Sequence, residues 1–223
     1  MIAVIIPVHN EEATLHACLL AVLHSTTHAG LAGERVHVVV VLDSCTDQSE
    51  AIASALGVHT IRVALKNVGA VRARGAAHAI EHGARWLANT DADTVVAPDW
   101  LWQQLHLGTD AVCGTVAVAD WTPHGNAAAR LRAHFARTYN DADGHRHIHG
   151  ANFGISTAAY CRAGGFAPLA CSEDVALLQA LQSVGASIAW TAAPRVVTSA
   201  RKNVRAANGF GDTLSAVVAN FES

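Results

Sequence analysis

The sequence predicts a single α/β domain with a mostly parallel central sheet and helices on both faces. Apolar runs alternate with helical segments through the first half of the chain, as in doubly wound proteins. Those runs are continuously apolar, which is typical of strands covered on both faces. With 223 residues, 51% of them hydrophobic and 15% charged, the chain is long enough for one sizeable core.

The first two strands are the clearest elements. Residues 2–7, "IAVIIP", form a short apolar run that ends at a proline. Residues 11–25 follow with leucine and valine at the spacing of one helix face. Residues 36–43, "VHVVVVLD", are rich in β-branched side chains and predict the second strand.

Four further elements complete the repeating pattern. A helix, a strand, a helix and a strand are expected at residues 46–57, 58–63, 70–83 and 85–91. Thr46 or Asp47 suits the N-cap of the first of these helices, and Gly57 suits its end.

The second half is less regular. A strand is expected at residues 110–120 and an extended segment at residues 147–156, followed by a short helix. Longer helices are predicted at 126–139 and 172–185, the latter opened by Ser172, and short strands at 187–190 and 195–199. No repeat, low-complexity tract or linker divides the chain.

Composition excludes several classes of protein. The net charge of −3 offers no field that would attract nucleic acid. Five scattered cysteines without a CxxC pair favour reduced thiols in a cytoplasmic protein. The first apolar run stops at Pro7 and is expected to be a strand, not a signal peptide, and no transmembrane segment is expected. No phosphate-binding GxxxxGK loop, GxGxxG loop or GxSxG elbow is present, so ATPase, dehydrogenase and hydrolase functions lose support.

Polar and acidic residues follow three of the predicted strands. Residues 7–11 come after the first strand, Asp43 after the second, and Asp91 and Asp93 after the fourth. Because ligands bind beyond the carboxyl ends of parallel strands, these groups are expected to converge on one edge. A role for Asp43 as a helix cap is the alternative.

Asp91-Ala92-Asp93 is the sharpest motif. A buried carboxylate without a partner is costly, so it is usually paired, neutralised or bound to metal. Two carboxylates here suit Mg²⁺ or Mn²⁺, which keep open positions for phosphate oxygens. The alternative is a turn in which aspartate caps the next element.

Glu173 and Asp174 stand in the first turn of a predicted helix. Acidic residues there are favoured by the helix dipole by about 0.3–1 kcal/mol each, which alone explains their presence. Asp174 is also the best-placed carboxylate in the second half to act as a base separate from the metal site.

Other candidates carry weaker signals. Arg72 and Arg74 are not both expected to face a ligand, and a solvated helix face is the alternative for them. His145, His147 and His149 would share one face of a strand, where a polar, partly exposed strand is favoured over zinc binding.

Basic residues cluster near the C-terminus. Arg201, Lys202 and Arg205 follow the last predicted strand, and Arg suits phosphate because its fork binds two oxygens. We expect residues 200–212 to close over a diphosphate-containing ligand; a solvated tail is the alternative.

Six segments in register resemble glycosyltransferase family 2, with its GT-A type fold. The resemblance covers roughly residues 2–205. It rests on "VIIPVHNEE", "VVVVLDSCTDQS", "NVGAVRARG", "NTDADT", "GANFGISTAAYCRAGGF" and "SEDVAL". The family often has Tyr where His9 stands and Asn where Ala73 stands, which leaves the donor base undetermined. No Gln-x-x-Arg-Trp motif of processive synthases follows.

The resemblance implies a metal-dependent inverting glycosyltransferase with a UDP- or GDP-sugar donor and Mn²⁺ or Mg²⁺. It divides the domain into a nucleotide-sugar half (1–97), an acceptor half (98–205) and a tail (206–223). Asp93 and Asp91 would hold the metal, Asp174 would be the base, and Glu173 would bind the acceptor or orient its helix. The implied nucleotide-sugar residues are Pro7, His9, Glu11, Asp43, Arg72, Asp91 and Ala92.

Two other functions remain open from the sequence. A sugar-1-phosphate nucleotidyltransferase would need a Gly- and Arg-rich loop after the first strand, which "PVHNEE" is not. A non-catalytic nucleotide-sugar-binding protein would keep Asp43 and Asp93 but need no base. The acceptor, whether a small molecule, a lipid or a glycan, and the oligomeric state are not assigned by the sequence.

Overall fold

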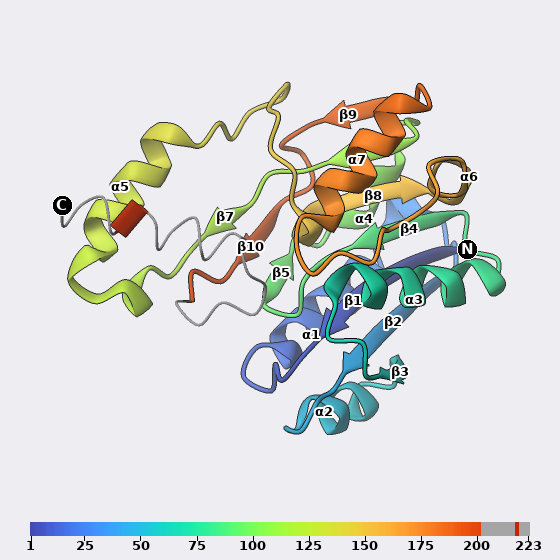
Figure 1. Ribbon diagram of the computed structural model, residues 1–223, viewed down its shortest axis with the longest axis horizontal. Coiled ribbons are helices and arrows are strands. Elements are labelled where there is room, and N and C mark those ends of the chain that lie inside the picture. The colour runs from blue at the N-terminus through green and yellow to red at the C-terminus, as the bar shows by residue number, and fades with distance from the viewer. Residues whose placement is uncertain (202–216, 219–223) are drawn as a thin grey trace.

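The computed structural model describes residues 1–201 and 217–218, and a seven-stranded sheet forms its centre (Figure 1). The strand order is β3-β2-β1-β4-β8-β6-β9. These strands are β1 (Ile2–Val8), β2 (Val36–Asp43), β3 (His59–Val63), β4 (Trp86–Asn89), β6 (Ala111–Cys113), β8 (Phe153–Ser156) and β9 (Ile188–Trp190).

The first four of these strands run parallel, as the alternating pattern predicts. Ile2 lies opposite both Val36 of β2 and Trp86 of β4, so the carboxyl ends of the three strands reach the same edge. Strand β8 is antiparallel to both β4 and β6, and this makes the sheet mixed.

Alternate residues of β1 face two separate apolar layers. Ala3 and Ile5 lie in one buried cluster with α3 (Val68–Glu81), α6 (Thr157–Arg162) and α7 (Glu173–Ser183). Ile2, Val4 and Ile6 lie in the other, with α1 (Leu15–Ser25), α2 (Ser49–Ala55) and α4 (Trp100–Leu105). Figure 1 shows α3 and α7 lying across the near face of the sheet. The prediction of helices on both faces is therefore confirmed.

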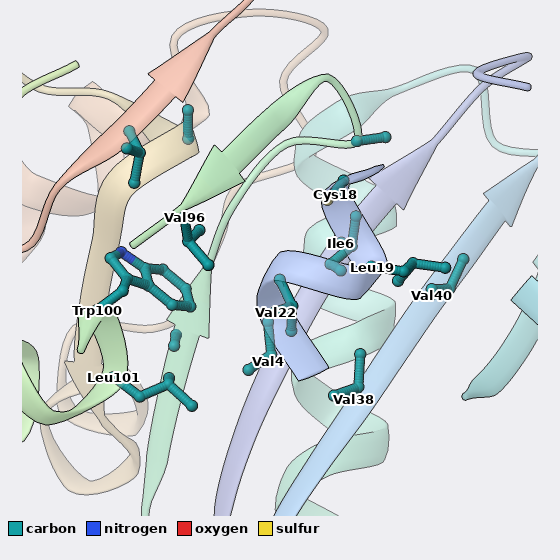
Figure 2. Close-up of a cluster of buried hydrophobic side chains, with 14 of the residues drawn as sticks. Val4, Ile6, Cys18, Leu19, Val22, Val38, Val40, Val96, Trp100 and Leu101 are labelled. Carbon is teal, nitrogen blue, oxygen red and sulfur yellow. The ribbon is translucent and has the colours of Figure 1, made fainter. Parts of the chain in front are cut away.

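The second apolar layer is drawn in Figure 2. Val4 and Ile6 of β1 and Val38 and Val40 of β2 point toward Leu19 and its neighbours on α1. Trp100 and Leu101 of α4 extend the same layer beyond β4, and Trp100 is fully buried. This core fixes the strands whose ends carry the acidic residues.

A small second sheet lies beyond the carboxyl ends of the central strands. It consists of β5 (Thr94–Val96), β10 (Val196–Thr198) and β7 (Ala117–Val118), in the order β5-β10-β7. Strands β5 and β10 are antiparallel, so the residues after Asp93 lie against the residues before Arg201. The remaining elements are α5 (Ala128–Thr138) and the 3₁₀ turns η1 (Ala29–Leu31), η2 (Thr122–Ala127) and η3 (Gly150–Asn152).

The single strand expected at 110–120 is wrong, because the chain changes sheets there. Strand β6 belongs to the central sheet and β7 to the small one. Between them the chain bends around buried Asn152, whose side-chain amide donates to the carbonyls of Thr115 and Pro194. A Cβ at Gly114 would lie 2.1 Å from the Asn152 Nδ2, so only glycine fits. Nothing in the apolar pattern marks this bend.

Helices α1 and α2 begin several residues later than expected. The first starts at Leu15 instead of residue 11, because the Glu11 carbonyl already accepts hydrogen bonds from Thr14 and Leu15 in a turn. The second spans Ser49–Ala55, with Gln48 at its N-cap position. Asp47, the residue before this N-cap position, still accepts a hydrogen bond from the Ser49 amide and so stabilises the first turn.

None of the helices in the described part of the chain is long and apolar enough to cross a lipid bilayer.

Candidate active site

The two aspartates of the Asp-Ala-Asp motif lie immediately after β4 and before β5. The Asp91 side chain is 39% exposed, whereas that of Asp93 is 11% exposed. Ala92 between them is buried in the apolar layer under α1. Burial first, and then the negative charge of Asp91, raise the pKa of Asp93 to about 6. The motif therefore combines an accessible carboxylate with a largely desolvated one.

Glu11 adds a third carboxylate from the loop after β1. Its backbone amide donates to the Ser49 hydroxyl, and its side chain accepts from the Thr14 hydroxyl at 3.1 Å. Arg201, which follows β10, pairs with Glu11 at 2.5 Å and with Asp93 at 3.2 Å. One cation from the far end of the chain thus lies between two carboxylates of this edge.

The loop after β1 also reaches the end of β2. The His9 ring nitrogen Nδ1 lies 2.6 Å from the Asp43 carbonyl oxygen and donates to it. The Asp43 carboxylate is buried and accepts from the Leu65 amide at 2.8 Å and from the Ser44 hydroxyl at 3.1 Å. These contacts hold the turn after β3, so Asp43 is not the cap of α2. Pro7 lies opposite Val41 in the same pair of strands.

Arg72 is the buried centre of the site. It extends from the first half of α3, where Asn67 caps the helix by accepting from the Ala70 amide. The guanidinium, 2% exposed, donates to Asp91 at 2.5 Å and to Glu173 at 3.0 Å. Arg74, two residues later, is exposed, as expected for a pair that cannot both face inward.

The two adjacent acids of α7 have different environments. Glu173 is buried against Arg72, and burial is the main cause that raises its pKa. Asp174 is only half-buried and accepts from the Gly150 amide at 2.7 Å and from the Val175 amide at 2.8 Å. Glu173 therefore fixes the helix against Arg72, while Asp174 keeps an accessible carboxylate.

Gly150 fits closely against the same arginine. A Cβ at this position would lie 2.6 Å from the Arg72 Nη2. Arg72, Gly150 and Asp174 thus form a continuous set of contacts from Asp91 to the start of α7. The glycine was not a candidate from the sequence, and no spacing rule would have indicated it.

The three alternating histidines are not in a strand. The rings of His145 and His147 stack at 5.5 Å, and Tyr139 stacks on His147 at 4.0 Å. The His149 Nε2 lies 2.9 Å from the Tyr139 hydroxyl, and burial followed by its two neighbouring histidines lowers its pKa to about 4. The three histidine rings and Tyr139 form a stack next to Gly150. Among the described residues, these three histidines are not grouped closely enough to hold a metal ion.

Cys18 is a further neighbour that the sequence did not indicate. Its thiol donates to the Asp91 carbonyl, and burial together with the adjacent aspartates raises the pKa of this thiol. Lys202 and Arg205, predicted with Arg201 to contact a diphosphate, lie outside the described residues, as does most of the closing segment at 200–212.

Residues 3–163 match the family Glycosyl transferase family 2. The chain belongs to this family. The match covers β1 to β8 and α1 to α6, including the loop after β1, Asp43, Arg72 and both aspartates of the motif. Helix α7, which carries Asp174, lies beyond the matched residues. So does strand β10, which precedes Arg201.

Solved structures similar to this family 2 chain are GT-A glycosyltransferases. A fragment of TarS from S. aureus, residues 1–349 in complex with UDP-GlcNAc, is 15% identical with a TM-score of 0.66 over 94% of this chain. The mannosyltransferase PcManGT from Pyrobaculum calidifontis, in complex with GDP-Man and Mn²⁺, is 18% identical with a TM-score of 0.63 over 91% of this chain. Both confirm the predicted fold.

A third similar structure is glucosyl-3-phosphoglycerate synthase from Mycobacterium tuberculosis in complex with Mn²⁺, UDP-glucose and phosphoglyceric acid. It is 19% identical with a TM-score of 0.60, and the alignment covers 89% of this chain and 71% of that one. This chain spans only 61% of the TarS fragment and 57% of PcManGT. A search of the curated proteins found no match.

Proposed function

We propose that this chain is a metal-dependent inverting glycosyltransferase that moves a sugar from a UDP- or GDP-sugar to an acceptor hydroxyl. The observation that carries the proposal is the Arg72 bridge. Arg72 ties Asp91, at the end of the donor-side strands, to Glu173, whose neighbour Asp174 faces the acceptor side. These contacts support a site in which the proposed metal ligand Asp91 and the proposed base Asp174 are connected through Arg72 and Glu173.

The acidic residues suit Mn²⁺ or Mg²⁺. Asp91, Asp93 and Glu11 supply carboxylate oxygens, which hard divalent cations prefer. Burial, followed by the negative charge of Asp91, raises the pKa of Asp93, and a cation would offset that charge. Asp93, with Asp91, would hold the ion. When bound, the ion neutralises charge on the leaving diphosphate and orients it. Arg201 already pairs with Asp93 and would give the diphosphate a second positive group.

The loop after β1 is proposed to bind the nucleoside. Pro7, His9 and Glu11 border the same edge as Asp43, and the His9–Asp43 contact keeps this loop against β2. Ala92 keeps the two metal-binding aspartates at a fixed spacing, since its side chain is buried. TarS bound to UDP-GlcNAc and PcManGT bound to GDP-Man support the donor class.

Asp174 is proposed as the catalytic base. Hydrogen bonds from the backbone amides of Gly150 and Val175 fix the orientation of its carboxylate. It would take the proton from the acceptor hydroxyl as the oxygen attacks the anomeric carbon opposite the leaving diphosphate, which inverts that carbon. Arg72 and Glu173 are positioning residues, because they are buried against each other.

The proposal includes a cytoplasmic location, an acceptor that is a small molecule, a lipid or a glycan, and no role for nucleic acid. The division into donor residues 1–97, acceptor residues 98–205 and tail 206–223 belongs to the same proposal. The Arg72–Glu173 pair joins the first two of these parts.

The test is to incubate the protein with a panel of UDP- and GDP-sugars, Mn²⁺ and candidate acceptors, and to measure the nucleoside diphosphate released. Nuclear magnetic resonance of the product's anomeric proton then reports inversion or retention. Tight donor binding without release in the presence of many acceptors would favour the binding-protein alternative. Formation of a nucleotide sugar and pyrophosphate from a sugar 1-phosphate and a nucleoside triphosphate would favour the nucleotidyltransferase alternative.

A further inference from the structure

A histidine cluster lies at the other end of the sheet from the acidic edge. His37 is the second residue of β2, His59 the first of β3, and His78 and His82 close α3. Helix α3 runs back from the acidic edge, so its last turn meets the starts of β2 and β3 (Figure 1). Nothing in the proposed transfer reaction uses these side chains.

The cluster brings metal-ligating nitrogen atoms together. One ring nitrogen from each of His37, His59 and His78 lies within 4.8 Å of the other two. The Nε2 atoms of His37 and His78 are 3.3 Å apart. In a tetrahedral zinc site with Zn–N bonds of about 2.0–2.1 Å, neighbouring ligand nitrogens lie about 3.3–3.4 Å apart. One edge of such a site is therefore already formed.

The surroundings of His37 and His78 disfavour the protonated form of these two rings. Partial burial, followed by repulsion from the neighbouring histidines, lowers the pKa of His37 and of His78. Neutral imidazole is the form that binds metal. The exposed His59 ring stacks on the His78 ring with the centroids 4.3 Å apart, and it turns out of this stack to point a nitrogen at a bound metal ion. His82, one helical turn after His78, fixes that turn through its Nδ1, which donates to the His78 carbonyl at 2.7 Å.

We infer that His37, His59 and His78 form a binding site for a divalent transition-metal ion, Zn²⁺ in the first place, with water completing the coordination. Three imidazoles without carboxylates suit zinc, copper and nickel and do not suit Mg²⁺ or Mn²⁺. The bound ion cross-links the end of α3 to edge strand β3 and to β2. It therefore serves a structural role, separate from the oxygen-rich edge.

Zinc binding is tested by isothermal titration calorimetry with Zn²⁺ on the full chain in excess Mg²⁺, which occupies the carboxylate site. We expect one Zn²⁺ per chain and a higher melting temperature with Zn²⁺ than without it. His59→Ala and His78→Gln should each weaken Zn²⁺ binding by at least about tenfold. His16→Ala is the matched control, since His16 is an exposed histidine on α1, under the opposite face of the sheet.

Two results would overturn the inference. One is the absence of stoichiometric Zn²⁺ binding by the unaltered chain, which would leave a hydrogen-bonded stack of neutral rings. The other is equal Zn²⁺ affinity in the unaltered chain and in His59→Ala, a substitution at an exposed position that leaves the core intact. Circular dichroism of each variant shows that it remains folded.

Discussion

Arg72 and Glu173 are 101 residues apart in the sequence and form a buried ion pair with Nε and Oε1 separated by 3.0 Å. The same guanidinium binds Asp91, so one side chain of α3 joins the end of β4 to the start of α7. This arginine holds the end of β4 and the start of α7 in their relative positions. Its replacement is therefore expected to lower the free energy of unfolding.

Replacing Arg72 with Met should destabilise the fold. The substitution leaves the buried Glu173 carboxylate without its cation, and breaking a buried pair in this way typically costs about 3–5 kcal/mol. The free energy of unfolding from urea titrations measures the effect. Arg74→Met is the matched control, because that side chain lies two residues along the same helix and is exposed. A loss below about 1 kcal/mol for Arg72→Met would contradict the role given to the pair.

Replacing Asp93 with Asn should abolish the metal-dependent part of donor binding. The change removes one carboxylate charge while keeping the shape, so Mn²⁺ should no longer strengthen nucleoside diphosphate binding. Turnover should fall by about 10²–10³-fold, because charge stabilisation by a metal is worth several kcal/mol. Calorimetry with and without Mn²⁺ measures the binding. Asp120→Asn, at an exposed aspartate, is the control. Turnover of the unaltered enzyme that EDTA leaves unchanged would refute the metal role.

Replacing Asp174 with Asn should separate binding from chemistry. The amide can still accept a hydrogen bond from Gly150 but cannot take a proton, so donor affinity should stay within a few-fold. We expect kcat to fall by roughly 10²–10⁴-fold, the usual scale for a general base. Glu173→Gln is the comparison: its effect should appear mainly in stability. Near-normal kcat in Asp174→Asn would move the base to another carboxylate.

His149 should make the protein less stable in acid. Its folded-state pKa of about 4 lies below the ordinary value of 6.5, so between these values the unfolded chain binds a proton that the folded chain does not. The free energy of unfolding should therefore fall as pH decreases from about 6.5 to 4, by up to roughly 3 kcal/mol from this residue.

The acid effect is isolated by comparing the unaltered chain with His149→Gln at pH 7 and pH 4. The variant should lose less stability over this interval than the unaltered chain. Glutamine can still contact the Tyr139 hydroxyl but does not titrate, so a constant offset at both pH values would show that burial does not lower the pKa of His149.

The first half of the fold, through β4, was predictable because its information is local. The β-branched run at 36–43 coincides with β2, and parallel pairing alone places Asp43 and Asp91 at one edge. The family resemblance agrees with the matched family over residues 3–163. The roles assigned to individual site residues remain predictions.

The remaining features depend on tertiary contacts that no periodicity encodes. The antiparallel direction of β8 follows from the path of the chain, and the bend between β6 and β7 follows from the fit of Gly114 against Asn152. The burial of Glu173 beside the more accessible Asp174 depends on Arg72, which the sequence places on a distant helix. The histidine cluster was missed because His37 and His59 come from separate strands.

The pairing of β5 with β10 has a consequence for the order of assembly. Thr94 and Thr198 are 104 residues apart, and their hydroxyls are 2.9 Å apart in the folded chain. Strands β1 to β4 are complete by residue 89, so they can pair while the ribosome is still extending the chain. Asp93 meets Arg201 only after more than a hundred further residues have been added, and closing so long a loop is slow. A nascent chain of this protein therefore carries the Asp93 carboxylate without its Arg201 partner until those residues have been added.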